Sequence, residues 1–211
     1  MAFDMGFNFR LTAVYVTDPA YAAPVLFEAY PHTYTNANGD SINAGWPDGN
    51  MDASNEDSGN DPRIAGLNGK ANSGGVKTFT VDLSSGSNPG AGDYTVDLAM
   101  GRAAAACINS FEVWDNTTLL IDGKNGGSGY FTNADEYIDA TLATVSATTT
   151  WTGTTASKTF ATTTALLKVA VEDVTSQTYV AHFRLTLGGA AATTRLQHLA
   201  YGISNGIFLG R

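Results

Sequence analysis

The chain has 211 residues, with 20 acidic and 11 basic side chains and a formal net charge of -9 at pH 7. That length suits one large domain with its own core. The charge argues against nucleic acid and anionic membranes as partners, because phosphate binding needs clustered Lys and Arg.

The amino terminus lacks the basic start, apolar run and small-residue cleavage site of a signal peptide, so we expect mature protein from Met1. No window reaches the roughly 18 uninterrupted apolar residues of a membrane helix. The single cysteine, Cys107, cannot form an internal disulfide, and its apolar surroundings predict a buried thiol.

Apolar residues alternate at a period of two along five segments, which is the pattern of strands with one buried face. These segments run from Phe7 to Tyr15, Phe79 to Leu83, Tyr94 to Met100, Leu167 to Val171 and Phe183 to Leu187. No helical period of adequate length accompanies them, and only 15% of the residues are charged. We therefore predict an all-β protein, an antiparallel β-sandwich of the jelly-roll type over residues 1–188.

Two pairs of segments have the appearance of hairpins. VKTFTVDL and DYTVDLAM are joined by SSGSNPGAGD, a turn-forming stretch, which predicts that the two strands pair with each other. FEVWDNTTLLID predicts a second hairpin that turns near Asp115, Asn116 and Thr117.

Two segments are predicted to lie outside the sandwich. Residues 31–75 form a long polar connection with few strand signals, and a loop of this length is usually functional or disordered. Residues 189–211 follow a Gly-Ala hinge and form an apolar C-terminal tail. Because an exposed apolar tail is unfavourable in water, we expect it to pack on this domain or on a neighbour.

Within the polar connection, residues 48–61 (DGNMDASNEDSGND) contain many carboxylates and amides and no positive charge. The spacing starts as a calcium-binding EF-hand loop does, but Ala53 stands where the glycine is needed and Gly59 where the bidentate Glu is needed. We expect an exposed loop and no cofactor, with an irregular calcium site as the alternative. The candidate calcium ligands are Asp48, Asn50, Asp52, Asp57 and Asp61.

The sequence offers no catalytic constellation. His32, His182 and His198 are far apart and have no zinc-ligand spacing, and no nucleophile elbow, P-loop or dinucleotide fingerprint is present. His182 points away from Phe183 on the same strand, which predicts an outer-face histidine or one with satisfied hydrogen bonds. We therefore expect a protein that is not an enzyme.

Aromatic residues near polar segments are the remaining candidates for binding. Loop aromatics can stack on the apolar faces of sugar rings while neighbouring Asp and Asn bind the hydroxyls. The candidates are Trp46, Tyr130, Phe131 and Trp151. The alternative is that these rings fill the ends of the sandwich.

The order of the motifs resembles the malectin-like and galactose-binding-like jelly rolls found beside carbohydrate-active enzymes. The matching pieces are Phe7-Asn-Phe9, Ala44-Gly-Trp46, Asp61-Pro-Arg63, Thr78-Phe-Thr-Val-Asp-Leu83, Asp93-Tyr-Thr-Val-Asp-Leu98 and Phe111-Glu-Val-Trp114. The resemblance implies a jelly roll that binds sugars through loop aromatics, with Trp46 and Tyr130 at the site.

A disulfide-free, Thr/Ala/Gly-rich jelly roll with long loops and an apolar tail also resembles bacteriophage virion components of the capsid-decoration or tail-fibre type, which fold in the host cytoplasm without a signal peptide. We therefore expect a structural protein of a virion, with itself or other proteins of the particle as partners. The assembly residues would be Leu196, Leu199, Tyr201, Ile207 and Phe208 of the tail. The alternative is a carbohydrate-binding module for a cell-surface glycan, secreted by a route not visible in the sequence.

Overall fold

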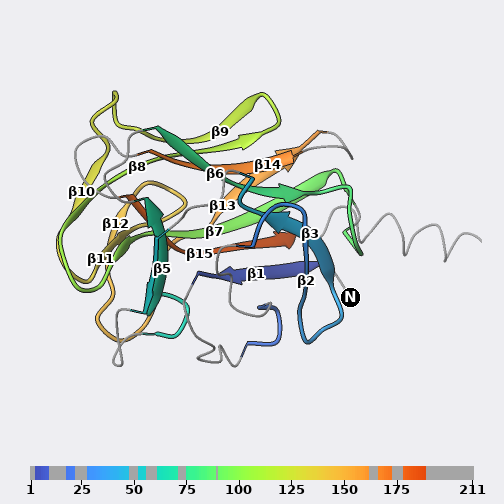
Figure 1. Ribbon diagram of the computed structural model, residues 1–211, viewed down its shortest axis with the longest axis horizontal. Coiled ribbons are helices and arrows are strands. Elements are labelled where there is room, and N and C mark those ends of the chain that lie inside the picture. Colours follow the sequence, from blue (N-terminus) through green and yellow to red (C-terminus); the bar gives the residue numbers. More distant parts are fainter. Residues whose placement is uncertain are drawn as a thin grey trace, which may run out of the picture.

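The computed structural model describes residues 3–9, 18–21, 28–47, 52–55, 61–70, 75–88, 90–161, 166–172 and 178–188. These residues form fifteen strands and no helix. The strands make two antiparallel sheets that lie face to face (Figure 1), so the predicted all-β antiparallel sandwich is confirmed. The finer assignment as a jelly roll stays a prediction, as does the division at residue 188.

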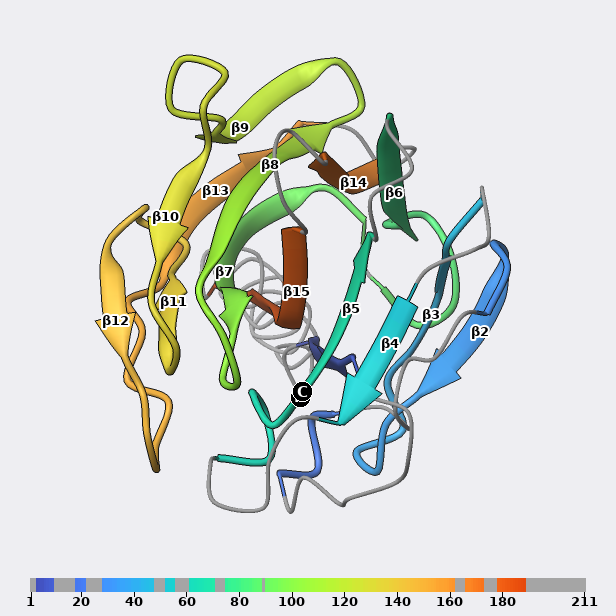
Figure 2. The same ribbon diagram turned by 60° about the vertical axis from the view of Figure 1, so that its left-hand side comes forward.

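The first sheet has eight strands in the order β12-β11-β7-β15-β5-β4, with β1 also paired to β15 and β13 to β7. Its strands are β1 (Asp4–Asn8), β4 (Asp52–Asn55), β5 (Gly66–Lys70), β7 (Gly92–Arg102), β11 (Glu136–Ile138), β12 (Thr144–Ser146), β13 (Ala156–Phe160) and β15 (Thr178–Leu187). The long strands β7 and β15 lie at its centre, and β5 and β4 follow on one side of them (Figure 2).

The second sheet has seven strands in the order β10-β8-β14-β6-β3-β2, with β9 also paired to β8. Its strands are β2 (His32–Thr35), β3 (Ser41–Gly45), β6 (Val76–Asp82), β8 (Cys107–Asp115), β9 (Thr118–Gly123), β10 (Tyr130–Thr132) and β14 (Leu166–Glu172).

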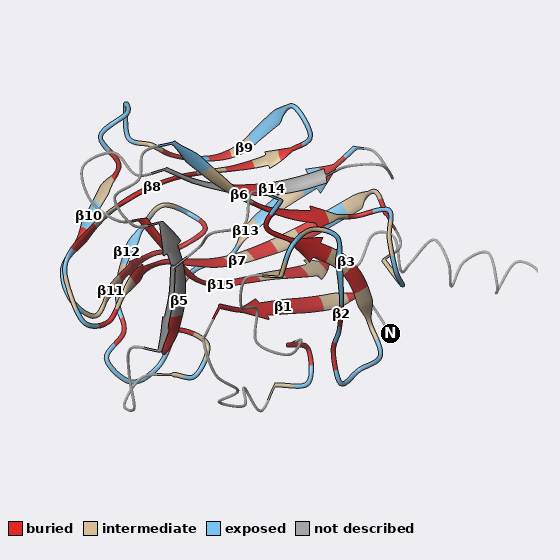
Figure 3. Cartoon of the chain, in the orientation of Figure 1, coloured by how far each residue is buried: buried red, intermediate tan, exposed pale blue. Residues whose placement is uncertain are grey.

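The main core is formed by buried residues from strands of both sheets, and Figure 3 shows buried positions recurring along the strands of both layers. Aromatic rings join the sheets directly. The Phe79 ring of β6 lies edge-on to the ring of Phe7 in β1, with centroids 5.2 Å apart, and to that of Phe9, at 5.0 Å. Such edge-to-face pairs add to the free energy gained by burying apolar area.

A second, smaller cluster covers the outward face of the eight-stranded sheet. Its buried members are Ile64, Ala99, Tyr137, Ala147, Trp151 and Ala181. The register of β15 against β7 shifts between Val180 and His182, which is a β-bulge. Beyond the bulge the alternation continues, so Phe183 points into the main core and His182 lies on the outward face, beneath the cover. Both sides of this sheet are therefore buried near β15.

Two predictions about the connections are wrong. β6 and β7 do not pair with each other, because β6 lies in the seven-stranded sheet and β7 in the eight-stranded sheet. The turn-rich segment between them therefore crosses from one sheet to the other. Residues 31–75 are not a strand-poor connection, since β2, β3, β4 and β5 all lie in them.

The short strands in residues 31–75 were not predicted because they contain few apolar residues and therefore lack the alternating apolar pattern. Backbone hydrogen bonds to neighbouring strands hold them in the sheets. In the β2–β3 hairpin only Tyr34, Ile42 and Ala44 are buried apolar residues. The second predicted hairpin is confirmed: β8 pairs with β9, and Asn116 at its turn has φ 54°. Asn tolerates this left-handed conformation better than most residues do. Cys107 is buried, as predicted.

Candidate functional site

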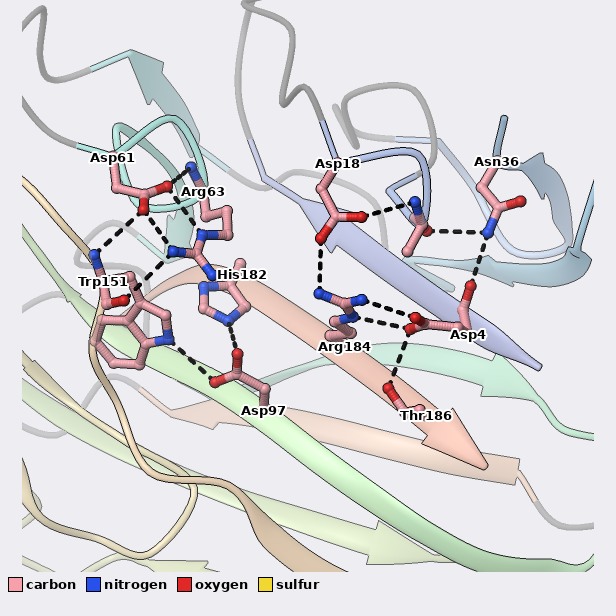
Figure 4. A network of polar contacts seen from close by, with 11 residues as sticks. Asp4, Asp18, Asn36, Asp61, Arg63, Asp97, Trp151, His182, Arg184 and Thr186 are labelled. Carbon is pink, nitrogen blue, oxygen red and sulfur yellow. Dashed lines mark hydrogen bonds and ion pairs between the residues drawn. The ribbon is translucent and has the colours of Figure 1, made fainter. Parts of the chain in front are cut away.

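A network of charged and polar side chains lies on the outward face of the eight-stranded sheet (Figure 4). One part is the turn that starts at Asp61. Asp61 Oδ1 accepts hydrogen bonds from the backbone N–H of Arg63 at 3.0 Å and from Nε of Arg63 at 2.9 Å. Arg63 Nη2 donates to the backbone carbonyl of Trp151 at 3.3 Å, and the backbone N–H of Trp151 donates to Asp61 Oδ2 at 3.3 Å. The Asp61–Arg63 pair therefore holds both backbone groups of Trp151.

The side chain of Trp151 connects the Asp61–Arg63 turn to Asp97 and His182 on the sheet. Its indole N–H donates to Asp97 Oδ1 at 3.1 Å, and Asp97 Oδ2 lies 3.2 Å from Nε2 of His182. Neither ring nitrogen of His182 makes an aligned hydrogen bond to a described residue. Figure 4 shows the imidazole between Asp97 and the guanidinium of Arg63, and its edge meets the Trp151 ring at a centroid distance of 5.3 Å.

These contacts set the charge of the carboxylates. Burial alone would raise the pKa of Asp97, but His182, the indole of Trp151 and the charge of Arg63 together hold it below its ordinary value. Burial opposes ionisation of Asp61 as well, yet its hydrogen bonds from Arg63 and Trp151 lower its pKa to about 2. Both groups are carboxylates at neutral pH.

A second network ties the first strand to the last described one. Arg184 of β15 pairs with Asp4 of β1 and with Asp18, while Asn36 donates to the backbone carbonyl of Asp4 at 2.7 Å (Figure 4). Burial opposes ionisation of Asp4, and the Arg184 guanidinium outweighs it, so the pKa of Asp4 lies below its usual range. The guanidinium also lies over the Tyr21 ring, 5.5 Å from its centroid.

The predicted sugar-binding aromatics fall into two groups. Trp46 is 1% exposed and packs with Phe9 and Phe79 in the main core, and Trp151 is 5% exposed inside the network. Neither ring has a free face: Trp46 fills the sandwich core, as the alternative has it, whereas Trp151 belongs to the separate cluster on the outward face of the eight-stranded sheet. Tyr130 is half-buried against the core, whereas Phe131 is 62% exposed. Only the pair on β10 is available to a ligand.

The other predicted sites lie mostly beyond the described residues. Asp48, Asn50 and Asp57 fall outside them, and of Asp52 only the backbone, in β4, is described. Asp61 is paired with Arg63, and no group of three or more His, Cys, Asp or Glu among the described residues could hold a metal ion. The tail residues Leu196, Leu199, Tyr201, Ile207 and Phe208 also fall outside, so the calcium and assembly sites stay predictions.

Asp97, Arg184 and Tyr21 were not among the site residues predicted from the sequence. Asp97 and Arg184 each stand between inward-facing residues of a strand, so their outward direction could be predicted. Their partial burial could not be predicted, because it depends on segments that are distant in sequence and cover this face. His182 was placed correctly on the side opposite Phe183, and it lies beneath the cover.

The described fold and networks define an all-β sandwich protein. No protein-family model matches the chain, and no curated protein matches it. Among solved structures it is similar to protein YxiM of Bacillus subtilis, at 15% identity and a TM-score of 0.47, over 88% of this chain. The chain spans 40% of the length of that structure.

The resemblance to malectin-like and galactose-binding-like domains stays a prediction. Among the described residues there is no helix long and apolar enough to cross a membrane.

Proposed function

We propose that the protein is a non-enzymatic structural protein of a larger assembly, and that this assembly is a virion. The observation that carries the proposal is how the sandwich ends. Leu187, at the end of the central strand β15, donates its backbone N–H to the carbonyl of Phe3 at 2.9 Å, and Gly188 donates to that of Asp93 at 2.6 Å. Residues 189–211 therefore follow a point that is fixed both to the residue before β1 and to β7.

A fixed origin suits a segment that binds a neighbouring subunit. The entropy lost when a tail binds is smaller if one end is already positioned. The sequence of residues 189–211 supplies apolar side chains whose burial would stabilise the contact, namely Leu196, Leu199, Tyr201, Ile207 and Phe208. The partly exposed ion pairs support the same proposal, since Arg184 and Arg63 hold carboxylates that would otherwise be free for chemistry.

The test compares three forms of the chain for incorporation into particles of the native source, separated by density gradient and followed by mass spectrometry. They are the wild type, a chain ending at Gly188, and a full-length chain with the five apolar tail residues changed to Ser. We expect the wild type to migrate with large particles at fixed stoichiometry and both variants to stay behind as folded protein. Normal incorporation of the variants, or a wild type found only as a small species, would contradict the proposal.

A second candidate function rests on β10. Phe131 has the highest exposure of the large hydrophobic residues described, and it stands beside half-buried Tyr130 after a glycine-containing turn. An exposed ring next to polar loops suits stacking on a sugar, so the alternative is a carbohydrate-binding module for a cell-surface glycan. Titration calorimetry with a panel of oligosaccharides tests it. We expect Phe131→Ala to abolish binding and Leu119→Ala, an exposed apolar control on β9, to keep it. Absence of binding across the panel argues against this candidate.

A further inference from the structure

Three buried side chains on the outward face of the eight-stranded sheet carry polar atoms without a hydrogen-bond partner among the described residues. The atoms are Oδ1 of Asn8, the hydroxyl of Tyr21 and Nδ1 of His182. The residues are 1%, 6% and 0% exposed. Roughly 90% or more of buried polar groups in folded proteins are hydrogen-bonded, so three such atoms in one place need an explanation.

The three side chains are neighbours. Asn8 of β1 and His182 of β15 are direct partners in the antiparallel ladder, so their side chains leave the sheet on the same face about 5 Å apart. The Tyr21 ring lies edge-on to the imidazole, with centroids 6.3 Å apart. One small molecule with an oxygen atom bridges polar groups that are up to about 6 Å apart, since each hydrogen bond spans about 3 Å.

The surrounding residues hold these groups in place. The Asn8 amide donates to the carbonyl of Pro62 at 2.9 Å, which turns Oδ1 away from that carbonyl. Gly6 gives the Tyr21 ring its position, because a Cβ atom at residue 6 would lie 2.7 Å from three of the ring atoms. The site is therefore built by packing as well as by polarity.

We propose that Asn8, Tyr21 and His182 form a buried binding site for a single hydroxyl-bearing molecule, either water or a small polyol. Asn8 Oδ1 can only accept a hydrogen bond, Nδ1 of a neutral imidazole accepts one when the proton is on Nε2, and the tyrosine hydroxyl can donate one. Water donates two hydrogen bonds and accepts others, so one water molecule matches these two acceptors and one donor, and two adjacent hydroxyl groups of a polyol match them together. The Asp97 carboxylate beside His182 disfavours an anion, and the described residues offer too few ligands for a metal ion.

Tyr21→Phe tests the site, because the direction of its effect on the melting temperature depends on whether a molecule is bound to the tyrosine hydroxyl. If the hydroxyl binds the molecule, its removal breaks a hydrogen bond, and we expect the melting temperature to fall by about 2 to 4 °C. If the hydroxyl has no partner, its removal relieves an unfavourable burial, and the melting temperature stays level or rises. Tyr137→Phe is the matched control, since the buried Tyr137 hydroxyl donates to the carbonyl of Ile64 at 3.2 Å.

Water–protein cross-relaxation in NMR spectra gives the second readout. We expect a long-lived signal at the Tyr21 and His182 rings in the wild type, retained in Tyr137→Phe and lost in Tyr21→Phe. A fall in melting temperature of Tyr21→Phe that matches the control supports the site, and a level or raised melting temperature overturns it. Ethylene glycol then separates the two occupants. A greater rise in melting temperature for the wild type than for Tyr21→Phe identifies a polyol site, and equal rises identify a water site.

Discussion

Arg184 of β15 and Asp4 of β1 form a bidentate ion pair between positions 180 residues apart. Nε lies 2.8 Å from Oδ1 and Nη2 lies 2.7 Å from Oδ2. The remaining Nη1 donates to Asp18 at 2.8 Å, so one guanidinium joins the first strand, the turn after it and the last described strand. The geometry depends on the planar fork of arginine, which a lysine ammonium cannot reproduce.

We expect Arg184→Lys to lower the free energy of unfolding by about 1 to 3 kcal/mol, because it keeps the charge but loses the paired hydrogen bonds. Urea denaturation of the single variants and of Arg184→Lys with Asp4→Asn measures the effect. The double variant should lose less than the sum of the single losses, since the two residues share one interaction. Strictly additive losses would mean that the pair contributes nothing of its own.

Stability should fall as the solution is made acidic, through Asp61. Its folded pKa of about 2 lies below the ordinary 3.8, so the folded protein binds fewer protons than the unfolded chain between these values. The contribution of Asp61 is therefore complete above about pH 4 and is lost as pH falls toward 2. Because solvent screens this partly exposed pair, we expect the ionised Asp61 to contribute about 1 to 2 kcal/mol to the free energy of unfolding at neutral pH.

Urea midpoints between pH 2 and 7 for the wild type and Asp61→Asn measure this contribution. The difference in unfolding free energy should be largest above pH 4 and shrink toward pH 2. The exposed Asp122, changed to Asn, serves as the surface control and should lower the free energy of unfolding less than Asp61→Asn does at pH 7. A difference for Asp61→Asn that stays constant with pH would show that its charge is not the source of the stability.

The sequence predicted the strands best where one face is apolar. Phe79 to Leu83 and Tyr94 to Met100 alternate at a period of two, and both fall largely within strands whose inward residues are fully buried. The pairing of these two strands with each other was predicted wrongly, because a turn-rich connector is compatible both with a hairpin and with a crossing between sheets. Pairing depends on contacts between distant residues, which local pattern does not contain.

The burial of two binding candidates, Trp46 and Trp151, was hidden from the sequence for a related reason. Trp46 and Trp151 stand among Gly, Asn, Thr and Ser, so the local sequence indicates exposed loops. In the structure Trp46 packs in the core beside Phe79. Trp151 lies against the sheet because its indole N–H donates to Asp97 and its backbone N–H donates to Asp61. The partners lie 54 and 90 positions away from Trp151, beyond the reach of any sequence window.

Trp151→Phe should destabilise the protein by about 1 to 3 kcal/mol. Phe retains much of the apolar contact with Tyr137 and His182 but removes the indole N–H, which leaves Asp97 Oδ1 buried without its donor. Thermal unfolding followed by circular dichroism measures the loss. Phe131→Ala is the control, since that ring is exposed and should contribute little to stability. An unchanged melting temperature for Trp151→Phe would mean that the indole hydrogen bond is not formed in solution.

Gly6→Ala should be destabilising because of Tyr21 rather than because of the backbone. The added methyl group would lie 2.7 Å from three atoms of the Tyr21 ring, which would have to leave its position against β1. We expect a loss of about 1 to 3 kcal/mol from overpacking, measured by urea denaturation. Tyr21→Ala removes the obstacle, so the double variant should be scarcely less stable than Tyr21→Ala alone. A full additional loss in the double variant would locate the strain elsewhere. A double variant as stable as Tyr21→Ala alone would establish that a glycine is required at position 6 so that the Tyr21 ring can pack beside His182.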